Sequence, residues 1–147
     1  MPREVSHCKD AKELMVLLDG LIYSIQNTGG ISRVFDQIIQ RLNRDDLTLY
    51  LYGEKRPSLE AHCEQVILNS RPYERTRKFR CPSSPADVVF HSTYYRTASA
   101  CVPTICTVHD LITRQFSFRS NLLDLIRARA IKRADKIICV SNYTKSR

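Results

Sequence analysis

Hydrophobic residues make up 43% of the 147-residue chain and charged residues 26%, which are ordinary values for a globular protein. They argue against a disordered or fibrous protein, and the length allows one ordinary domain. The net charge is +8, from 23 Lys and Arg residues against 15 Asp and Glu residues. This excess favours acidic partners, meaning phosphate-bearing ligands, nucleic acid or an anionic membrane surface.

The amino-terminal residues 1–13 are polar, mix acidic and basic side chains, and are predicted to be an extension of the folded domain. They contain no small-residue cleavage site, and the apolar run that follows at 14–18 is only five residues long. A signal-peptide core needs about seven apolar residues and a membrane span about twenty. We therefore expect a cytoplasmic protein.

The cysteines favour free thiols. They are spread along the chain and include no C-x-x-C pair, which argues against both a disulfide framework and a structural zinc site. The six positions are Cys8, Cys63, Cys81, Cys101, Cys106 and Cys139.

The first elements predicted along the chain are a strand, a loop and a helix. The solid apolar run at 14–18 is typical of a fully buried strand. Residues 21–28 are predicted as a loop. From 31 to 42, apolar residues recur at helical spacing, and the intervening polar residues, Ser32 among them, are expected to face solvent.

The remaining chain continues the alternation of strands and helices. Further apolar runs predict strands at 47–52, 65–68, 87–91, 104–109 and 136–140. A second helix is predicted over 121–134, and a third is expected to begin at Ser141. A short helix is expected at 59–63, and residues 69–85 are predicted as a loop or an irregular helix.

This alternation predicts an α/β fold: a Rossmann-like doubly wound parallel sheet in a single domain over 14–147. Such sheets bind ligands at the carboxyl ends of their strands. Polar residues follow four of the predicted strands, at Asp19-Gly20, His91-Ser92-Thr93, His109-Asp110 and Ser141-Asn142.

A glycine pair, Gly29-Gly30, stands directly before the first predicted helix. Glycines let a ligand approach the backbone, and a helix amino terminus favours an anion, to which Arg33 could add a bidentate contact. A flexible turn that leads into a helix explains the same pair without a ligand.

Two histidines follow predicted strands. His109, with Asp110 beside it, is the best candidate for contact with a substrate hydroxyl or for acid–base chemistry. A histidine bonded to a neighbouring loop is the alternative for His109, and it is the favoured interpretation for His91.

The basic residues form two clusters, at 71–80 and 127–136, each with five basic residues against one acidic residue. Contact of residues 71–80 with anionic lipid headgroups is one interpretation of the first cluster. The second cluster is interpreted as the solvated face of a helix. We expect no nucleic-acid binding, because only Tyr73 and Phe79 interleave the first cluster and no docking module is present.

Five blocks occur in an order that resembles a known family. They are Asp19-Gly20, GGISR at 29–33, DVVFHSTYY at 87–95, TVHDLI at 107–112 and RADKIICVS at 133–141. In these blocks the chain resembles the amino-terminal, acceptor-side domain of a family 4 retaining glycosyltransferase of the GT-B fold. The resemblance covers residues 14–147.

The resemblance implies a cleft between two Rossmann-like domains, with a nucleotide-sugar donor and a glycan or lipid-linked acceptor. It implies mannosyltransferase-like transfer with retention of configuration, without metal or cofactor. A peripheral place at the inner face of a membrane rests instead on the basic cluster at 71–80, as one interpretation of that cluster. Gly29 and Gly30 would approach the donor phosphates, with Arg33 nearby, and His109 would orient the donor sugar. The remaining implied positions are Thr93, Tyr94, Tyr95 and Asp110 on the acceptor side, and Ser141 and Thr144 at the start of the cleft helix.

The donor-binding half, with its Glu-x7-Glu motif, is not in this sequence. We therefore expect the chain to be the truncated front part of a longer enzyme and to be inactive by itself, because a cleft needs both walls. A non-catalytic binding module for a phosphorylated or lipid-linked glycan and a degenerate gene fragment are the alternatives.

Overall fold

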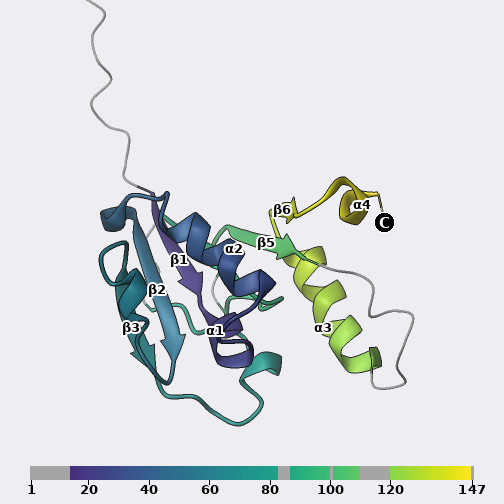
Figure 1. Cartoon of the computed structure of the whole chain (residues 1–147). Coiled ribbons are helices and arrows are strands. Elements are labelled where there is room, and N and C mark those ends of the chain that lie inside the picture. The colour runs from purple at the N-terminus through teal and green to yellow at the C-terminus, as the bar shows by residue number, and fades with distance from the viewer. Residues whose placement is uncertain (1–13, 83–86, 100, 110–119, 147) are drawn as a thin grey trace, which may run out of the picture.

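The computed structural model describes residues 14–82, 87–99, 101–109 and 120–146. Their strands form one six-stranded sheet with neighbouring strands parallel, in the order β3-β2-β1-β4-β5-β6 (Figure 1). The strands are β1 Met15–Asp19, β2 Leu47–Tyr52, β3 Glu64–Leu68, β4 Val88–Ser92, β5 Thr104–Val108 and β6 Lys136–Cys139. The predicted bounds differ from these by at most one residue at either end. The sheet confirms the predicted Rossmann-like α/β fold, and the predicted extension 1–13 lies outside the described residues.

The strand order places a crossover point beside β1. From β1 the chain first builds outward through β2 and β3, and it then returns to the other side of β1 with β4. In doubly wound sheets the crevice at such a reversal, beyond the carboxyl ends of the strands, is where ligands bind.

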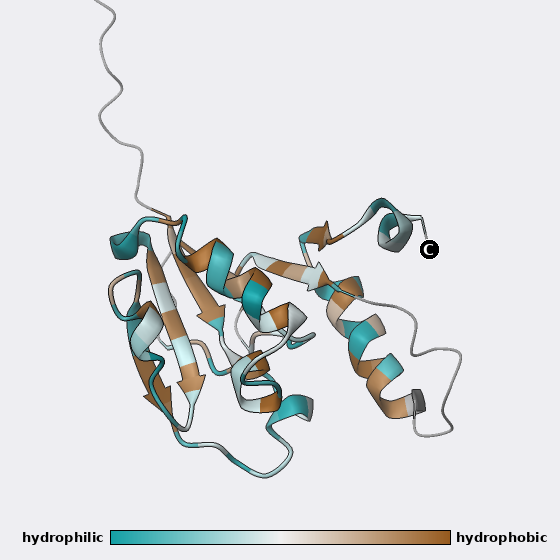
Figure 2. Cartoon of the chain, in the orientation of Figure 1, coloured by the Kyte–Doolittle hydropathy of each residue, from teal (hydrophilic) through white to brown (hydrophobic). Residues whose placement is uncertain are grey.

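Helix α2, Gly30–Ile39, covers one face of the sheet. Its apolar stripe packs on the first hydrophobic core, in which Phe35 and Ile39 lie against Leu18 and Leu49. Figure 2 shows both hydrophobic and hydrophilic residues along α2, as expected of a helix with one apolar face. The expectation that Ser32 faces solvent is wrong, because this residue is only 1% exposed. Its hydroxyl donates to the Gly29 carbonyl oxygen, which holds the side chain against the start of the helix.

The opposite face has a different cover. Helix α3, Ser120–Arg133, packs on the β5 side of this face, where Ala130 contacts Cys106 and Val108. On the β1 and β4 side the cover is extended chain: Phe79 packs against Phe90 at a centroid distance of 4.9 Å. A short helix, α4 Asn142–Lys145, follows β6 and confirms the helix expected at Ser141.

The prediction of a loop at 21–28 is wrong for its first part, which forms helix α1, Leu21–Ile25. Leu21, Ile22 and Tyr23 are buried in this helix, and the Ile22 amide donates to the Thr93 hydroxyl at 3.1 Å. Tertiary contacts thus stabilise a helix that is too short to show a periodicity.

Two further irregular segments differ from their predictions only in detail. The short helix expected at 59–63 is instead a 3₁₀ turn at Pro57–Leu59, because Pro57 favours a helical start. A further turn follows, in which the His62 and Cys63 amides donate to the Leu59 carbonyl oxygen. The described part of the segment predicted at 69–85, residues 69–82, is irregular as expected, with a 3₁₀ turn at Glu74–Thr76; residues 83–85 lie outside the described residues. A third 3₁₀ turn, Arg44–Asp46, precedes β2.

Candidate functional site at the carboxyl edge of the sheet

The glycine pair lies at the amino terminus of α2, as predicted. Gly29 is the N-cap residue in extended conformation, and no side chain caps the helix. The first N–H groups of a helix have no intrahelical acceptor, so this end is open to an anion. A Cβ atom added at Gly30 would meet nothing within 4 Å. The fold therefore gives no steric reason for glycine at Gly30, and Arg33 is exposed on the first turn.

A polar cluster supports the loop that leads to this pair. Arg56 donates through Nη1 to Asn27 Oδ1 at 2.6 Å, and its guanidinium lies 4.2 Å from the centre of the Tyr23 ring. The Tyr23 hydroxyl in turn donates to Asp36 of α2 at 2.8 Å. The loop is thus tied both to α2 and to the β2–β3 connection, which orients the glycines. Sequence reasoning missed Arg56, because no local pattern distinguishes it from a surface arginine.

His109 follows the last residue of β5 and is half-buried. Its amide donates to the Tyr95 hydroxyl at 3.2 Å, and its ring lies edge-on to Phe35 of α2 at a centroid distance of 5.5 Å. Its Nε2 is buried and has no hydrogen-bond partner among the described residues. Burial lowers the pKa of His109 to about 4, so the ring is neutral near pH 7.

His91 occupies the other side of Phe35, with a centroid distance of 5.5 Å. Unlike the His109 ring, the His91 ring has a hydrogen-bond partner: its Nε2 lies 2.8 Å from Thr107 Oγ1. Burial, with a smaller effect of His109, lowers its pKa to about 4. His91 is therefore a structural histidine, as the sequence favoured.

The turn that follows β4 carries the predicted acceptor-side residues. Thr93 is fully buried, and its hydroxyl donates to the Asp19 carbonyl at 2.6 Å, so the structure places it in the interior rather than on a ligand-facing surface. Tyr95 is also buried and has a left-handed backbone with φ 50°. Tyr94 is partly exposed and accepts a hydrogen bond from Arg75 at 3.1 Å. Tyr94 is thus the member of this group that a ligand could reach.

A buried ion cluster, defined by Asp19, Tyr52, Glu74 and Arg96, holds that turn in place. Arg96 is 2% exposed, and it contacts Asp19 at 3.2 Å and Glu74 at 2.8 Å. The Tyr52 hydroxyl also donates to Asp19 and accepts from Arg96. Burial raises the pKa of Asp19 to about 6, against the opposing effect of Arg96. Sequence reasoning noted Asp19 only as a strand end and missed Glu74 and Arg96, because their pairing is long-range.

Ser141 and Thr144 are close together at the start of α4. The Thr144 amide donates to Ser141 Oγ at 3.1 Å, and the two hydroxyl oxygens lie 2.9 Å apart. This contact is the N-cap that the sequence predicted for Ser141. The remaining candidate, Asp110, lies outside the described residues.

In the described part of the chain, no three His, Cys, Asp or Glu side chains lie close enough to hold a metal ion. Metal independence stays a prediction. Five cysteines, Cys63, Cys81, Cys101, Cys106 and Cys139, are free thiols, as expected. No helix within the described ranges combines the length and the apolar character needed to cross a membrane.

Comparison with known proteins identifies a family. The family model for Glycosyltransferase Family 4 matches residues 28–147, which is most of the chain. No curated protein and no solved structure matched the chain. The matched region contains the glycine pair of α2, the turn after β4, His109 and the start of α4. The chain belongs to glycosyltransferase family 4, in which it corresponds to the amino-terminal domain.

Proposed function

We propose that this domain forms one wall of a site that transfers a hexosyl group, mannosyl-like, from a nucleotide-sugar to a glycan or lipid-linked acceptor. The observation that carries the proposal is the unpaired Nε2 of His109, a neutral buried nitrogen at the carboxyl edge of the sheet. Buried polar atoms are normally hydrogen-bonded, so an unpaired one suits a ligand that completes it. The family membership supports sugar transfer in general.

The open amino terminus of α2 supports a role toward the donor phosphates. Its free N–H groups and the helix dipole favour negative charge, and Arg33 is free to approach the same anion. The empty space at Gly30 leaves room for a phosphate close to the backbone. Most of the donor would be held by a second, donor-binding domain of the kind that the resemblance implies.

His109 would hold the donor sugar by a hydrogen bond between Nε2 and a sugar hydroxyl. A neutral imidazole nitrogen can donate or accept according to its tautomer, so it orients the sugar without adding charge. In the proposed transfer, the bond from the anomeric carbon to the phosphate oxygen breaks and a bond to the acceptor oxygen forms on the same face. Because the new bond forms on the face that the phosphate leaves, configuration is retained. The acceptor proton passes to the leaving phosphate oxygen, and the proposed step uses no metal.

The test is a titration of the isotopically labelled chain with GDP-mannose and with UDP-glucose, followed by amide NMR. We expect shifts at Gly29, Gly30 and His109, and weaker shifts at these amides in a His109→Ala variant. A His62→Ala variant serves as the control, since His62 lies before β3, at the amino edge of the sheet. Shifts confined to other regions, or equal effects of the two variants, would contradict the proposal.

We also propose peripheral contact with an anionic membrane through residues 71–80. Arg77, Lys78 and Arg80 are exposed there, and Tyr73 at the tip is 81% exposed with φ 58°. An exposed aromatic ring beside basic side chains suits the membrane–water interface. Arg71 and Arg75 are already bonded, to Glu74 and Tyr94 respectively, and add less to this surface.

The membrane contact is tested by sedimentation of the chain with phosphatidylglycerol vesicles. A Tyr73→Ser/Arg80→Gln variant is expected to bind more weakly than the original chain. A Lys55→Gln variant, which removes an exposed charge from the β2–β3 connection, is expected to bind normally. Equal binding of all three proteins would rule out residues 71–80 as the contact.

A further inference from the structure

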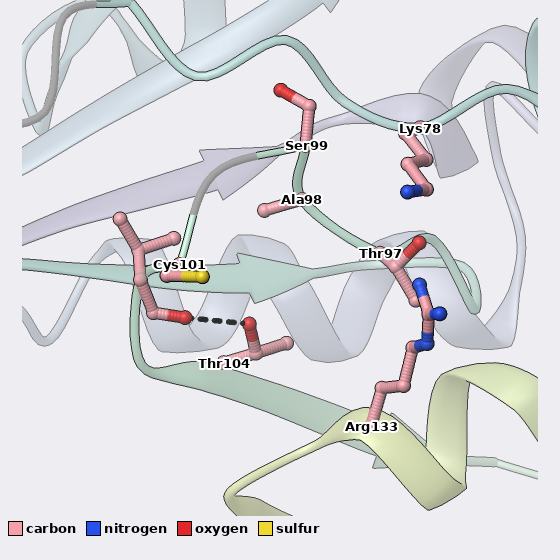
Figure 3. Close-up of a pocket in the computed structure, with 8 residues that line it drawn as sticks. Lys78, Thr97, Ala98, Ser99, Cys101, Thr104 and Arg133 are labelled. Atoms are coloured by element: carbon pink, nitrogen blue, oxygen red, sulfur yellow. Dashed lines mark hydrogen bonds between the residues drawn. The ribbon is translucent and has the colours of Figure 1, made fainter.

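A hollow of about 300 Å³ lies at the amino end of β5, on the face of the sheet that α3 covers (Figure 3). Its walls come from four segments: the stretch at Lys78, the connection between β4 and β5, the start of β5, and the last residue of α3, Arg133. The connection contributes Thr97, Ala98, Ser99, Cys101 and Val102, and β5 contributes Thr104.

The hollow joins the two basic clusters that are separate in the sequence. Lys78 belongs to the cluster at 71–80 and Arg133 to the cluster at 127–136. In Figure 3 their side chains extend toward each other, with the Thr97 hydroxyl between them. Both cations are exposed, and neither has a carboxylate within 4.0 Å among the described residues. Two cations that share one hollow without a counter-ion attract an anion.

The hydroxyl groups that line the hollow differ in whether they can donate a hydrogen bond to a ligand. Thr104 Oγ1 already donates to the Val102 carbonyl at 3.0 Å, so it has no proton left for a ligand. Thr97 and Ser99 have no such side-chain bond in the described part of the chain and are free to donate. Asp135 lies near this wall, but its Oδ2 is bonded to the Thr104 amide at 2.8 Å, and the Asp135 amide donates to the Thr104 carbonyl at 2.9 Å. These two hydrogen bonds hold the Asp135 carboxylate against the first residue of β5.

This hollow is separate from the site at the carboxyl edge. Thr104 is the first residue of β5, whereas His109 follows its last residue. Five strand residues span roughly 16 Å, so one ligand group cannot contact both ends. The hollow therefore belongs to another binding event than the proposed sugar transfer.

We propose that the hollow binds an ionised phosphate group, held by Lys78, Arg133 and the hydroxyls of Thr97 and Ser99. Lysine supplies a point charge and arginine a fork of N–H donors, a pair that suits a tetrahedral oxyanion. The phosphate can come from a soluble compound or from the headgroup of an anionic lipid. This inference goes beyond the proposed function and does not depend on it.

The experiment compares three proteins: the full chain, a Lys78→Gln/Arg133→Gln variant, and a Lys55→Gln/Lys145→Gln variant. The last removes two exposed charges away from the hollow and leaves the net charge equal to that of the first variant. Binding of inorganic phosphate is measured by amide NMR at Thr97 and Ser99, with chloride as the reference salt. Binding to phosphatidylglycerol vesicles is measured by sedimentation, with phosphatidylcholine vesicles as the reference. Circular dichroism checks that each protein is folded.

We expect binding to weaken about tenfold or more in Lys78→Gln/Arg133→Gln, since two charge-assisted hydrogen bonds are lost. It should change by less than about twofold in the control variant, which loses only long-range attraction. Loss of inorganic phosphate binding identifies the free ion as a sufficient ligand. Loss of vesicle binding alone identifies the lipid headgroup, provided that the Tyr73→Ser/Arg80→Gln variant, which leaves the hollow unchanged, still binds the vesicles. If that variant loses vesicle binding as well, the loss belongs to the surface at 71–80 and rules out the lipid headgroup as the ligand of the hollow. Equal weakening in both variants, or no binding of either probe, would overturn the proposal.

Discussion

Strands β2 and β6 are both short and largely apolar, but their surroundings differ. β2, Leu47–Tyr52, is buried at all of its positions, with Leu49 in the first hydrophobic core. β6, Lys136–Cys139, is an edge strand whose Ile137 and Ile138 are 48% and 45% exposed. Both are short apolar runs that predict fully buried strands.

The difference shows that burial depends on neighbours more than on the strand itself. β2 pairs with strands on both sides and lies under α1 and α2, whereas among the described strands β6 pairs only with β5. In Figure 1 β6 lies at the far side of the sheet from β2. The stabilising contacts are thus concentrated on the β1–β2–β4 side, and four predictions test that contrast.

The largest effect is expected from Arg96→Met, in the buried ion cluster on the stable side. The substitution leaves two buried carboxylates, Asp19 and Glu74, without their shared cation, and should lower the free energy of unfolding by about 3–5 kcal/mol. Denaturant titration measures this loss. Adding Asp19→Asn to Arg96→Met should recover part of the stability. A loss under about 1 kcal/mol would mean that the cluster does not hold the turn after β4.

The second prediction compares the two strands directly. Leu49→Ala should cost about 2–5 kcal/mol, since it leaves a cavity in a packed core. Ile138→Ala should cost less than about 1 kcal/mol, because its side chain is already half in solvent. Urea unfolding of both variants measures the difference. Equal losses would mean that β6 is covered in solution.

The third prediction concerns pH, through His91 on β4. Its pKa is lowered from 6.5 to about 4 on folding, chiefly by burial, so below pH 6.5 the unfolded chain binds the proton more readily. Stability therefore falls as pH decreases from 6.5 to 4, by up to about 3 kcal/mol for this residue. In a His91→Gln variant the fall should be shallower by that amount. Asp19, with its raised pKa, acts in the opposite direction and is common to both proteins. Parallel pH profiles would contradict the prediction.

The last prediction concerns two glycine substitutions with opposite effects on stability. Gly30→Ala should raise the stability by up to about 1 kcal/mol, because alanine favours a helix and nothing obstructs its methyl group. Gly20→Ala should lower it by about 1–3 kcal/mol, since the new Cβ would lie 2.7 Å from the Tyr50 carbonyl oxygen. Thermal unfolding distinguishes the two. The Gly30→Ala variant should also lose the amide shifts with nucleotide-sugar, because its methyl group fills the space proposed for the phosphate.

The regular elements were predictable because their patterns are local. The helical spacing of apolar residues in α2 and the short apolar run of each strand lie within one stretch of the chain, so they specify the type and position of each element. The alternation of strands and helices specified a parallel sheet. The site at the carboxyl edge was predictable in part: the glycine pair, His109 and the cap at Ser141 lie next to element ends. Helix α1 was missed because its stability comes from burial of Leu21 and Ile22 rather than from a repeat.

The sequence by itself thus determined the fold class, the family blocks and the residues that follow each strand, since all of these depend on neighbours along the chain. Only the tertiary structure decided which of these residues are accessible: it buried Thr93 and Tyr95, left Tyr94 partly exposed and left Nε2 of His109 without a partner. It alone joined Asp19, Glu74 and Arg96, and brought Lys78 and Arg133 to one hollow. The physical reason is that ion pairs and cavities form between segments that are distant in the sequence, and no periodicity of the sequence indicates such contacts.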